Sequence, residues 1–214
     1  MCTNFTPTIR TDWVKHNFDV ALPSGFPAES YPGFAAPLVV KSHQNDRVAC
    51  GFARFGLIPS WAKEDKIGRH TYNARSETVA EKPSFRSAWK HRQYGLVLVD
   101  NFYEPNYESG KAVRWKIELA SAEPFGIACL WDRWTDPSTG ELIVSFSMLT
   151  VNADEHPVMN QFHKLGDEKR TPVIIAPDFH DRWLSAEPGQ AAELMTWRHM
   201  PALTAMPAPR VLFS

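Results

Sequence analysis

The chain has 214 residues, of which 43% are hydrophobic and 22% are charged, a composition typical of folded globular proteins and not of disordered ones. Its 23 basic and 24 acidic residues give a formal net charge of −1, so a nucleic-acid partner would need a local basic surface. No long apolar run predicts a membrane span, and no signal peptide is recognisable. We expect one domain over residues 1–214 in a cytoplasmic protein.

Strands outnumber helices when the chain is followed from its start. Seventeen prolines are spread along the sequence and favour short elements. Residues 21–37, with four of these prolines, are expected to be a loop. The alternation or apolar character of residues 48–58, 96–99, 113–119, 125–130, 142–151 and 173–175 predicts strands, with a turn at Thr139-Gly140. Short helices are expected at 84–92, 177–184 and 190–197. Because strands and helices do not alternate regularly, we predict an α+β fold with a mainly antiparallel sheet.

Three widely spaced cysteines, Cys2, Cys50 and Cys129, argue against a disulfide framework and for a reducing compartment. Cys50 and Cys129 lie in apolar strand patterns and are expected to be inert core thiols. No pair of His or Cys residues has metal-ligand spacing, and no glycine-rich phosphate loop is present. We therefore predict neither a metal nor a cofactor.

Cys2 directly follows Met1. If Met1 is removed, Cys2 carries an α-amine whose ordinary pKa is about 7.7–8.0, against about 10.4 for lysine. Such an amine condenses with an aldehyde at neutral pH, and the adjacent thiol can then add to the imine and close a thiazolidine ring. The alternative is that position 2 is only a small residue that permits removal of Met1.

Three further segments carry polar groups suited to catalysis or binding. In Thr71–Thr78, Asn73 offers an amide and Arg75 a guanidinium fork for phosphate; a helix N-cap is the alternative reading. Glu104 follows an apolar strand and could act as a general acid or base, or be a solvated turn carboxylate. His163 is one of eight histidines and, taken alone, is expected to be a surface residue.

The segment from Lys82 to Val99 contains four cations and no acid before its final strand. Its interleaved aromatic residues suit single-stranded nucleic acid, which is held by charge neutralisation and base stacking. We expect Phe85 and Trp89 to face the core of an amphipathic helix. Arg86, in the same segment, remains a candidate for DNA contact.

In their order and spacing, these pieces resemble the SOS response-associated peptidase (SRAP) family. The resemblance rests on Cys2, residues 55–63 (FGLIPSWAK), 73–78 (NARSET), 102–104 (FYE), 149–150 (LT), His163 and 170–174 (RTPVI), and so covers most of the chain. It implies a barrel-like sheet and a sensor of abasic sites in single-stranded DNA. It also implies a protein that removes its own initiator methionine.

By motif position, the resemblance implies that Cys2 forms a thiazolidine crosslink with the ring-opened sugar. Asn73 matches the residue that holds the cysteine and the sugar, Glu104 the acid/base carboxylate, and His163 the histidine near the sugar. Contacts with DNA are expected from Trp61, Arg75, Arg86 and Thr150. The partner is expected to be abasic single-stranded DNA, with the protein a monomer that is associated with the bacterial nucleoid when crosslinked.

The sequence also departs from the family pattern. Thr3 and Asn4 stand where a glycine and an arginine are usual, Phe55 replaces a tryptophan, and Asn101 and Pro105 flank the Phe-Tyr-Glu motif. The seven residues 164–170 follow His163 where about three are usual. Two other functions stay open: a thiol peptidase acting on other proteins, with His163 as the base of Cys2, and a non-catalytic module for single-stranded DNA. An abasic-site lyase activity could accompany crosslinking.

Overall fold

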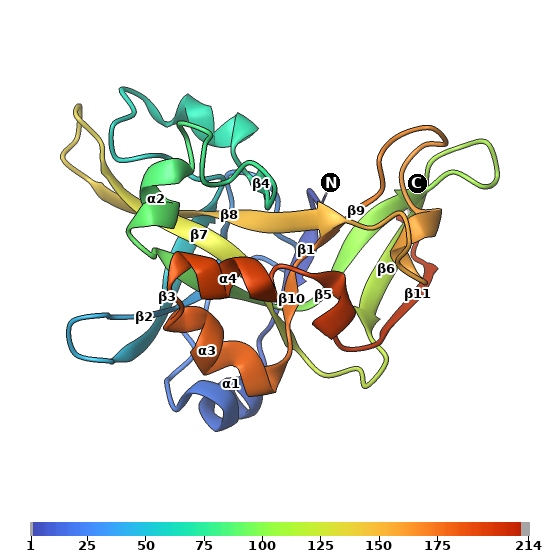
Figure 1. Cartoon of the computed structure of the whole chain (residues 1–214), viewed down its shortest axis with the longest axis horizontal. Coiled ribbons are helices and arrows are strands. Elements are labelled where there is room, and N and C mark those ends of the chain that lie inside the picture. Colours follow the sequence, from blue (N-terminus) through green and yellow to red (C-terminus); the bar gives the residue numbers. More distant parts are fainter. Residues whose placement is uncertain (1, 211–214) are drawn as a thin grey trace.

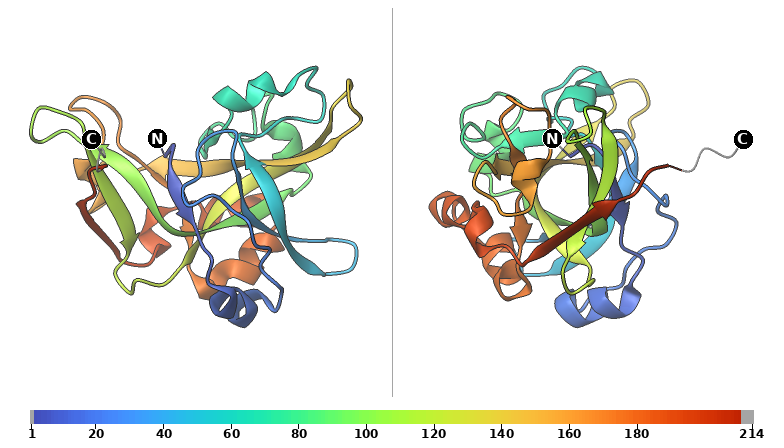
Figure 2. Two further views of the ribbon diagram at one scale, coloured as in Figure 1. Left: turned by 180° about the vertical axis from the view of Figure 1, so that it is seen from behind. Right: turned by 90° about the vertical axis from the view of Figure 1, so that its right-hand side faces the viewer.

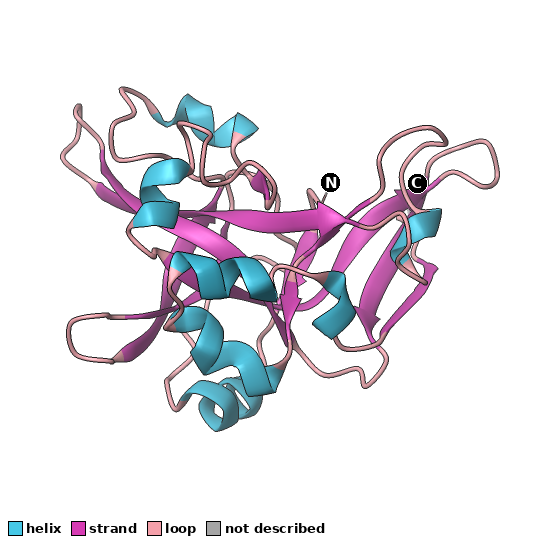
Figure 3. Cartoon of the chain, in the orientation of Figure 1, coloured by secondary structure: helices cyan, strands magenta, loops and turns pink. Residues whose placement is uncertain are grey.

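One mainly antiparallel sheet organises the protein (Figures 1 and 3). The computed structural model describes residues 2–210. Its strands are β1 (Phe5–Pro7), β2 (Ala35–Lys41), β3 (Val48–Phe55), β4 (Asn73–Arg75), β5 (Tyr94–Asn106), β6 (Val113–Leu119), β7 (Phe125–Thr135), β8 (Leu142–Asn152), β9 (Arg170–Pro172), β10 (Ile174–Ile175) and β11 (Leu203–Pro207).

A closed ring of strands forms the centre of the sheet. Neighbours follow the order β7-β8-β3-β2-β5, and a further pairing of β5 with β7 closes the ring. In the right-hand view of Figure 2 these strands are seen end-on around the barrel axis. Only the pairings of β3 and β4 with β8 are parallel among the described strands. The predicted α+β fold with a barrel-like, mainly antiparallel sheet is thus confirmed.

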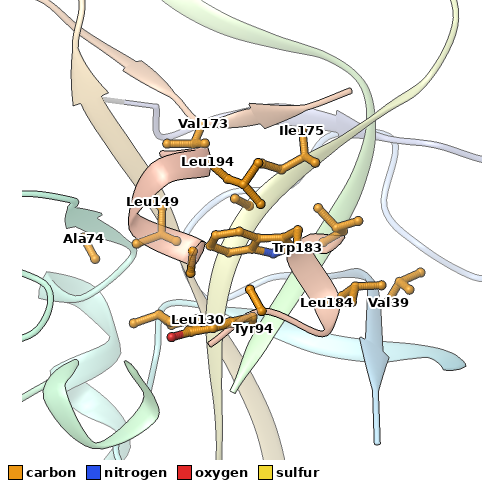
Figure 4. Close-up of a cluster of buried hydrophobic side chains, with 14 of the residues drawn as sticks. Val39, Ala74, Tyr94, Leu130, Leu149, Val173, Ile175, Trp183, Leu184 and Leu194 are labelled. Atoms are coloured by element: carbon orange, nitrogen blue, oxygen red, sulfur yellow. The ribbon is translucent and has the colours of Figure 1, made fainter. Parts of the chain in front are cut away.

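The central strands are buried on both faces, which explains their continuous apolar runs. Along β5, Val97 packs in the cluster that fills the barrel, whereas Leu96 and Leu98 face a second cluster under the helices. Trp183 lies at the centre of this second cluster, which Figure 4 shows. Its indole Nε1 donates a hydrogen bond of 2.9 Å to the carbonyl oxygen of Gly95 and thereby ties the helical layer to β5.

The helices are short and cover the outside of the barrel. They are α1 (Thr11–Phe18), α2 (Arg86–Lys90), α3 (His180–Leu184) and α4 (Pro188–Leu194), with short 3-10 helices at Asp65–His70, Met159–Gln161, Pro177–Phe179 and Trp197–His199. Phe85 and Trp89 are buried, as predicted for the core-facing side of α2. Within residues 2–210, no helix is long and apolar enough to cross a membrane.

Several predicted boundaries are wrong. The expected loop at 21–37 ends early, because β2 begins at Ala35 and includes Pro37. The helix α1 was not predicted: Arg10 occupies its N-cap position and makes no side-chain capping bond, so the usual start signal is missing. Strand β11, also unpredicted, has β6 as its one partner among the described strands, and its last two residues are exposed. The turn at Thr139-Gly140 is confirmed, with Gly140 at a φ of 75°.

Candidate active site and DNA-binding surface

Cys2 lies buried beside β5, with none of its surface exposed. Strand β1 pairs with β5 through Phe5 and Phe102, and the backbone N–H of Tyr103 donates to the carbonyl oxygen of Asn4 over 2.9 Å. This pairing runs the first residues antiparallel to β5 and brings Cys2 next to Glu104. The position of Cys2 is therefore fixed by sheet hydrogen bonds and not by a flexible tail.

Asn73 reaches Cys2 from the neighbouring strand β4, which pairs in parallel with β8. The Nδ2 of Asn73 donates a hydrogen bond of 2.7 Å to the backbone carbonyl oxygen of Cys2. Its Oδ1 is buried and has no hydrogen-bond donor among the described residues. Because a buried acceptor without a donor is costly, this oxygen is suited to receive a proton donor from a bound substrate or from a free amine of Cys2. The alternative of a helix N-cap is wrong, since Asn73 lies in a strand.

Glu104 is only 2% exposed. The alternative of a solvated turn carboxylate is wrong, because β5 continues through Glu104 to Asn106. Burial disfavours the charged form and raises the pKa of Glu104 to about 7. The carboxyl group therefore exchanges a proton near neutral pH, where a general acid or base is most effective.

His163 faces Glu104 across the site, and its side chain is 11% exposed. Its Nδ1 lies 3.7 Å from Oε2 of Glu104, and its Nε2 lies 3.1 Å from the carbonyl oxygen of Arg170. Since a carbonyl oxygen can only accept, Nε2 carries the proton. Burial lowers the pKa of His163, so the ring is neutral at pH 7 and presents an unprotonated Nδ1 to the carboxyl group.

The backbone holds His163 in an unusual conformation. Its φ is 65°, in the left-handed region that side chains other than glycine seldom adopt. The backbone N–H of His163 donates to the carbonyl oxygen of Pro105 over 3.1 Å. Strain of this kind persists only when the surroundings enforce it, and here it fixes the imidazole beside Glu104.

The thiol of Cys2 is not preset as a thiolate. Burial, reinforced by the nearby charge of Glu104, raises its pKa above the ordinary value of 9.0. Its Sγ lies 3.6 Å from the carbonyl oxygen of Asn4 and donates to it. Reactive thiolates occur next to cations or at helix N-termini, whereas the Cys2 thiol lies next to the carboxyl group of Glu104. The thiol is therefore suited to adding to an electrophile that has already been activated by another group.

Two of the expected DNA-contacting residues, Trp61 and Arg86, share a surface groove of about 670 Å³. Trp61 is 55% exposed, and Lys90 and His91 also line the groove. An exposed indole beside cations is the combination that binds single-stranded nucleic acid by stacking and charge. None of the residues around Cys2 described above lines this groove.

The other two expected contacts, Arg75 and Thr150, occupy adjacent strands but differ in exposure. The side chain of Arg75 is 51% exposed and pairs with Glu168 at 2.8 Å. Thr150 is fully buried, and its Oγ1 accepts a hydrogen bond of 3.2 Å from Nε of Arg170. Thr150 therefore does not present its hydroxyl to the surface, and it supports Arg170 instead.

Arg114 was not singled out from the sequence. Its guanidinium lies over the ring of Tyr103, 3.3 Å from the centroid, and donates to Oδ1 of Asn4 at 2.7 Å and to Glu29 at 2.8 Å. It lines a pocket of about 240 Å³ with Glu104. The alternation of residues 113–119 predicts the strand that carries Arg114. It does not predict that Arg114 binds Asn4 and Glu29, which come from distant parts of the chain. Within residues 2–210, no group of three or more His, Cys, Asp or Glu side chains is arranged to hold a metal.

The model of the family described as SOS response associated peptidase (SRAP) matches residues 1–211. The chain belongs to the SRAP family. A SRAP relative, the abasic site processing protein YoqW of Bacillus subtilis, is 32% identical over 191 residues, which cover 86% of this chain and 80% of YoqW. The abasic site processing protein HMCES of Xenopus tropicalis is 30% identical over 145 residues, or 58% of this chain and 41% of HMCES.

Solved structures agree with the SRAP assignment. A protein from Bordetella bronchiseptica superposes with a TM-score of 0.86 at 30% identity, covering 98% of this chain and all of that one. A protein from Bacteroides thetaiotaomicron superposes with a TM-score of 0.75 at 22% identity, covering 96% and 91%. The second likeness concerns the fold alone.

Proposed function

We propose that this SRAP protein processes abasic sites in single-stranded DNA by forming a covalent thiazolidine crosslink through Cys2. The observation that carries the proposal is that Asn73, Glu104 and His163, from three separate segments of the chain, lie together at Cys2. The relatives named as abasic site processing proteins support the choice of substrate.

The proposed reaction begins with removal of Met1, which frees the α-amine of Cys2. The ring-opened abasic sugar presents an aldehyde at C1′. The amine attacks this carbon, and loss of one water gives an imine. The thiol of Cys2 then adds across the C=N bond, with sulfur bonding to carbon and the proton passing to nitrogen. The product is a five-membered thiazolidine; removal of Met1 consumes one water, and the crosslinking of Cys2 to the sugar releases one.

Glu104 and His163 are placed to move the protons of this reaction. A carboxyl group with a pKa of about 7 can protonate the departing hydroxyl of the carbinolamine and later take the proton from the thiol. The neutral His163 offers Nδ1 as a second proton acceptor at 3.7 Å from that carboxylate. Asn73 holds the Cys2 carbonyl and thereby orients the amine.

For the DNA strand, we propose stacking on Trp61 and phosphate contacts from Arg75 and Arg86. We propose a supporting role for Thr150, which holds the buried Arg170. Residues 1–214 would act as one domain and one monomer. The proposed location is the bacterial cytoplasm, with the crosslinked form on the nucleoid.

Two further activities belong to the same proposal. The imine acidifies the neighbouring C2′ proton of the sugar, so strand cleavage by β-elimination is an expected side reaction. Removal of Met1 by the protein itself would supply the peptidase activity in the family's name. A thiol peptidase acting on other proteins is less well supported, because Cys2 is buried and its pKa is raised.

The test is a crosslinking assay with a single-stranded oligonucleotide that carries one abasic site, analysed on a denaturing gel. We expect wild type and the control Cys50→Ser, which alters another free thiol, to give a heat-stable adduct. Cys2→Ser retains an amine but has no thiol, so its adduct should survive only after reduction with borohydride. A heat-stable adduct of Cys2→Ser without borohydride would remove the thiazolidine from the mechanism.

A further inference from the structure

The segment 164–169 places the carboxylate of Glu168 beside two arginines of the sheet, Arg75 on β4 and Arg170 on β9. It follows His163 and leads into β9, and Figure 1 shows it rising next to the loop between β5 and β6. Lys164 lies over the ring of Tyr107 at 6.0 Å, which joins the two loops. The segment therefore adjoins the candidate active site.

Glu168 bridges two guanidinium groups. Its Oε2 lies 2.8 Å from Nη1 of Arg75, and its Oε1 lies 2.5 Å from Nη1 of Arg170. Arg170 is 2% exposed and is also held by Glu77 at 2.9 Å and by the carbonyl oxygen of Thr150 at 2.7 Å. Arg170 is thus fixed within the protein, whereas Arg75 projects from the edge of β4 with half of its side chain exposed.

The bridging geometry matches that of a phosphodiester. A DNA phosphate offers two non-bridging oxygens that share one negative charge, and guanidinium groups bind it as they bind a carboxylate. Although partial burial acts in the opposite direction, the hydrogen bond from Arg170 and the charges of Arg170 and Arg75 hold the pKa of Glu168 below its ordinary value. The carboxylate is therefore charged at neutral pH.

We propose that Glu168 is an intramolecular competitor of DNA: its carboxylate occupies the phosphate position at Arg75, and a bound strand displaces it. The inference rests on the proposed DNA function and adds to it a residue that lowers the affinity for the strand. Every strand that binds at Arg75 must first break the ion pair with Glu168.

The loop allows this displacement without unfolding. Lys169 anchors its base, since the backbone N–H of Lys169 donates to Asp154 at 3.0 Å and its Nζ donates to the carbonyl oxygen of His163 at 3.1 Å. The loop tip is loosely packed, because Leu165 is 99% exposed. Rotation of the Glu168 side chain is enough to release Arg75, while Glu77 continues to hold Arg170.

A different role for Glu168 predicts the opposite result. If its carboxylate served to orient Arg75 toward DNA, removal of the charge would weaken binding. Glu77→Gln is the matched control. Glu77, like Glu168, is a carboxylate that pairs with Arg170, but none of the described ion pairs joins Glu77 to Arg75. The control therefore removes one negative charge without releasing Arg75.

The experiment measures binding of a fluorescent single-stranded 15-mer without an abasic site to wild type, Glu168→Gln, Glu168→Ala and Glu77→Gln at several salt concentrations. We expect both Glu168 variants to bind about two- to tenfold more tightly than wild type. The gain should shrink as the salt concentration rises, because salt screens the ion pair between Arg75 and Glu168 that the strand must break in wild type. Glu77→Gln should change affinity by less than about twofold.

Equal or weaker binding by the Glu168 variants overturns this inference, even if wild type binds DNA and crosslinks. An equal gain in Glu77→Gln also overturns it, because the effect would then be one of net charge. The gain should disappear in Arg75→Gln/Glu168→Gln, and its persistence there would likewise contradict the role of Arg75. Failure of wild type and both Glu168 variants to bind DNA at all would overturn the proposed function together with this inference.

Discussion

Asn73 donates a hydrogen bond of 2.7 Å from its side-chain Nδ2 to the backbone carbonyl oxygen of Cys2. The two residues are far apart in the sequence, and the bond joins the first residues of the chain to β4. The side-chain amide of Asn73 also carries a buried oxygen, Oδ1, which accepts no hydrogen bond from residues 2–210. One side chain thus fixes the nucleophile and also offers an acceptor to the reacting groups.

Asn73→Ala should slow crosslinking because the Cys2 carbonyl and its amine are no longer held in place. Loss of a buried hydrogen bond costs about 1–3 kcal/mol, which corresponds to a rate about 5- to 150-fold lower. The rate is measured with saturating abasic oligonucleotide. Asn17→Ala is the control, since Asn17 also donates to a backbone carbonyl, that of Trp13 at 2.9 Å, but lies on α1. A rate for Asn73→Ala equal to that of Asn17→Ala would contradict the assignment.

Glu104→Gln should lower the crosslinking rate and remove the part of its pH dependence that Glu104 contributes, leaving the part that comes from the α-amine of Cys2. Burial places the pKa of this carboxyl group at about 7, so its proton is gained and lost in the range where the wild-type rate should change. General acid–base catalysis contributes about 100- to 10,000-fold, and the variant should lose a comparable factor. Rates are compared between pH 5.5 and 8.5. A wild-type profile that is retained in the variant would assign the titration to another group.

The same substitution should stabilise the fold at high pH. Because the folded-state pKa of Glu104 is raised from 4.5 to about 7, the folded protein binds more protons, and stability falls as pH rises through this range. A difference of about 2.5 pH units corresponds to at most about 3 kcal/mol. We expect the free energy of unfolding of Glu104→Gln to exceed that of wild type by about 1–3 kcal/mol at pH 8.5 and to match it near pH 4.

Urea unfolding at the two pH values measures this difference. The exposed Glu141 supplies a control, since Glu141→Gln should leave stability unchanged at both. A Glu104→Gln protein that is less stable than wild type at pH 8.5 would mean that the ionised carboxylate is a net stabilising group.

Trp61→Ala should weaken binding of single-stranded DNA with little effect on the crosslinking rate at saturation. Stacking of a base on an aromatic side chain contributes about 1–3 kcal/mol, and the exposed indole lies in the groove with Arg86. The oligonucleotide concentration at half-maximal rate should rise about 5- to 150-fold. Leu142→Ala removes another exposed apolar side chain and should leave that concentration unchanged. Equal effects of the two variants would argue against stacking on Trp61.

Periodicity predicted the strands well where one face is polar or where both faces are buried, as in β6 and the middle of β5. It failed at Glu104, because Asp100 and Asn101 interrupt the apolar run after Val99 and suggest that the strand has ended. The strand continues, however, since β1 and β6 supply hydrogen-bonding partners on its two sides. Those partners come from distant parts of the chain and leave no local signal.

The order of the motifs predicted four site residues, Cys2, Asn73, Glu104 and His163. It did not predict how their side chains are arranged relative to one another. The tautomer of His163 depends on the carbonyl oxygen of Arg170, and the burial of Thr150 depends on packing that the sequence does not reveal. The contact of Glu168 with Arg75 joins residues more than ninety positions apart. Such long-range side-chain pairs become visible only in the folded structure.

The central claim is that the amine and the thiol of Cys2 both bond to the abasic sugar. Intact-protein mass spectrometry of wild type and Cys2→Ala after reaction with an abasic oligonucleotide tests it directly. We predict a wild-type adduct whose mass equals the chain without Met1 plus the oligonucleotide minus one water, and no stable adduct of Cys2→Ala without borohydride. A wild-type adduct that retains Met1, or an equally stable adduct of Cys2→Ala, would contradict the account.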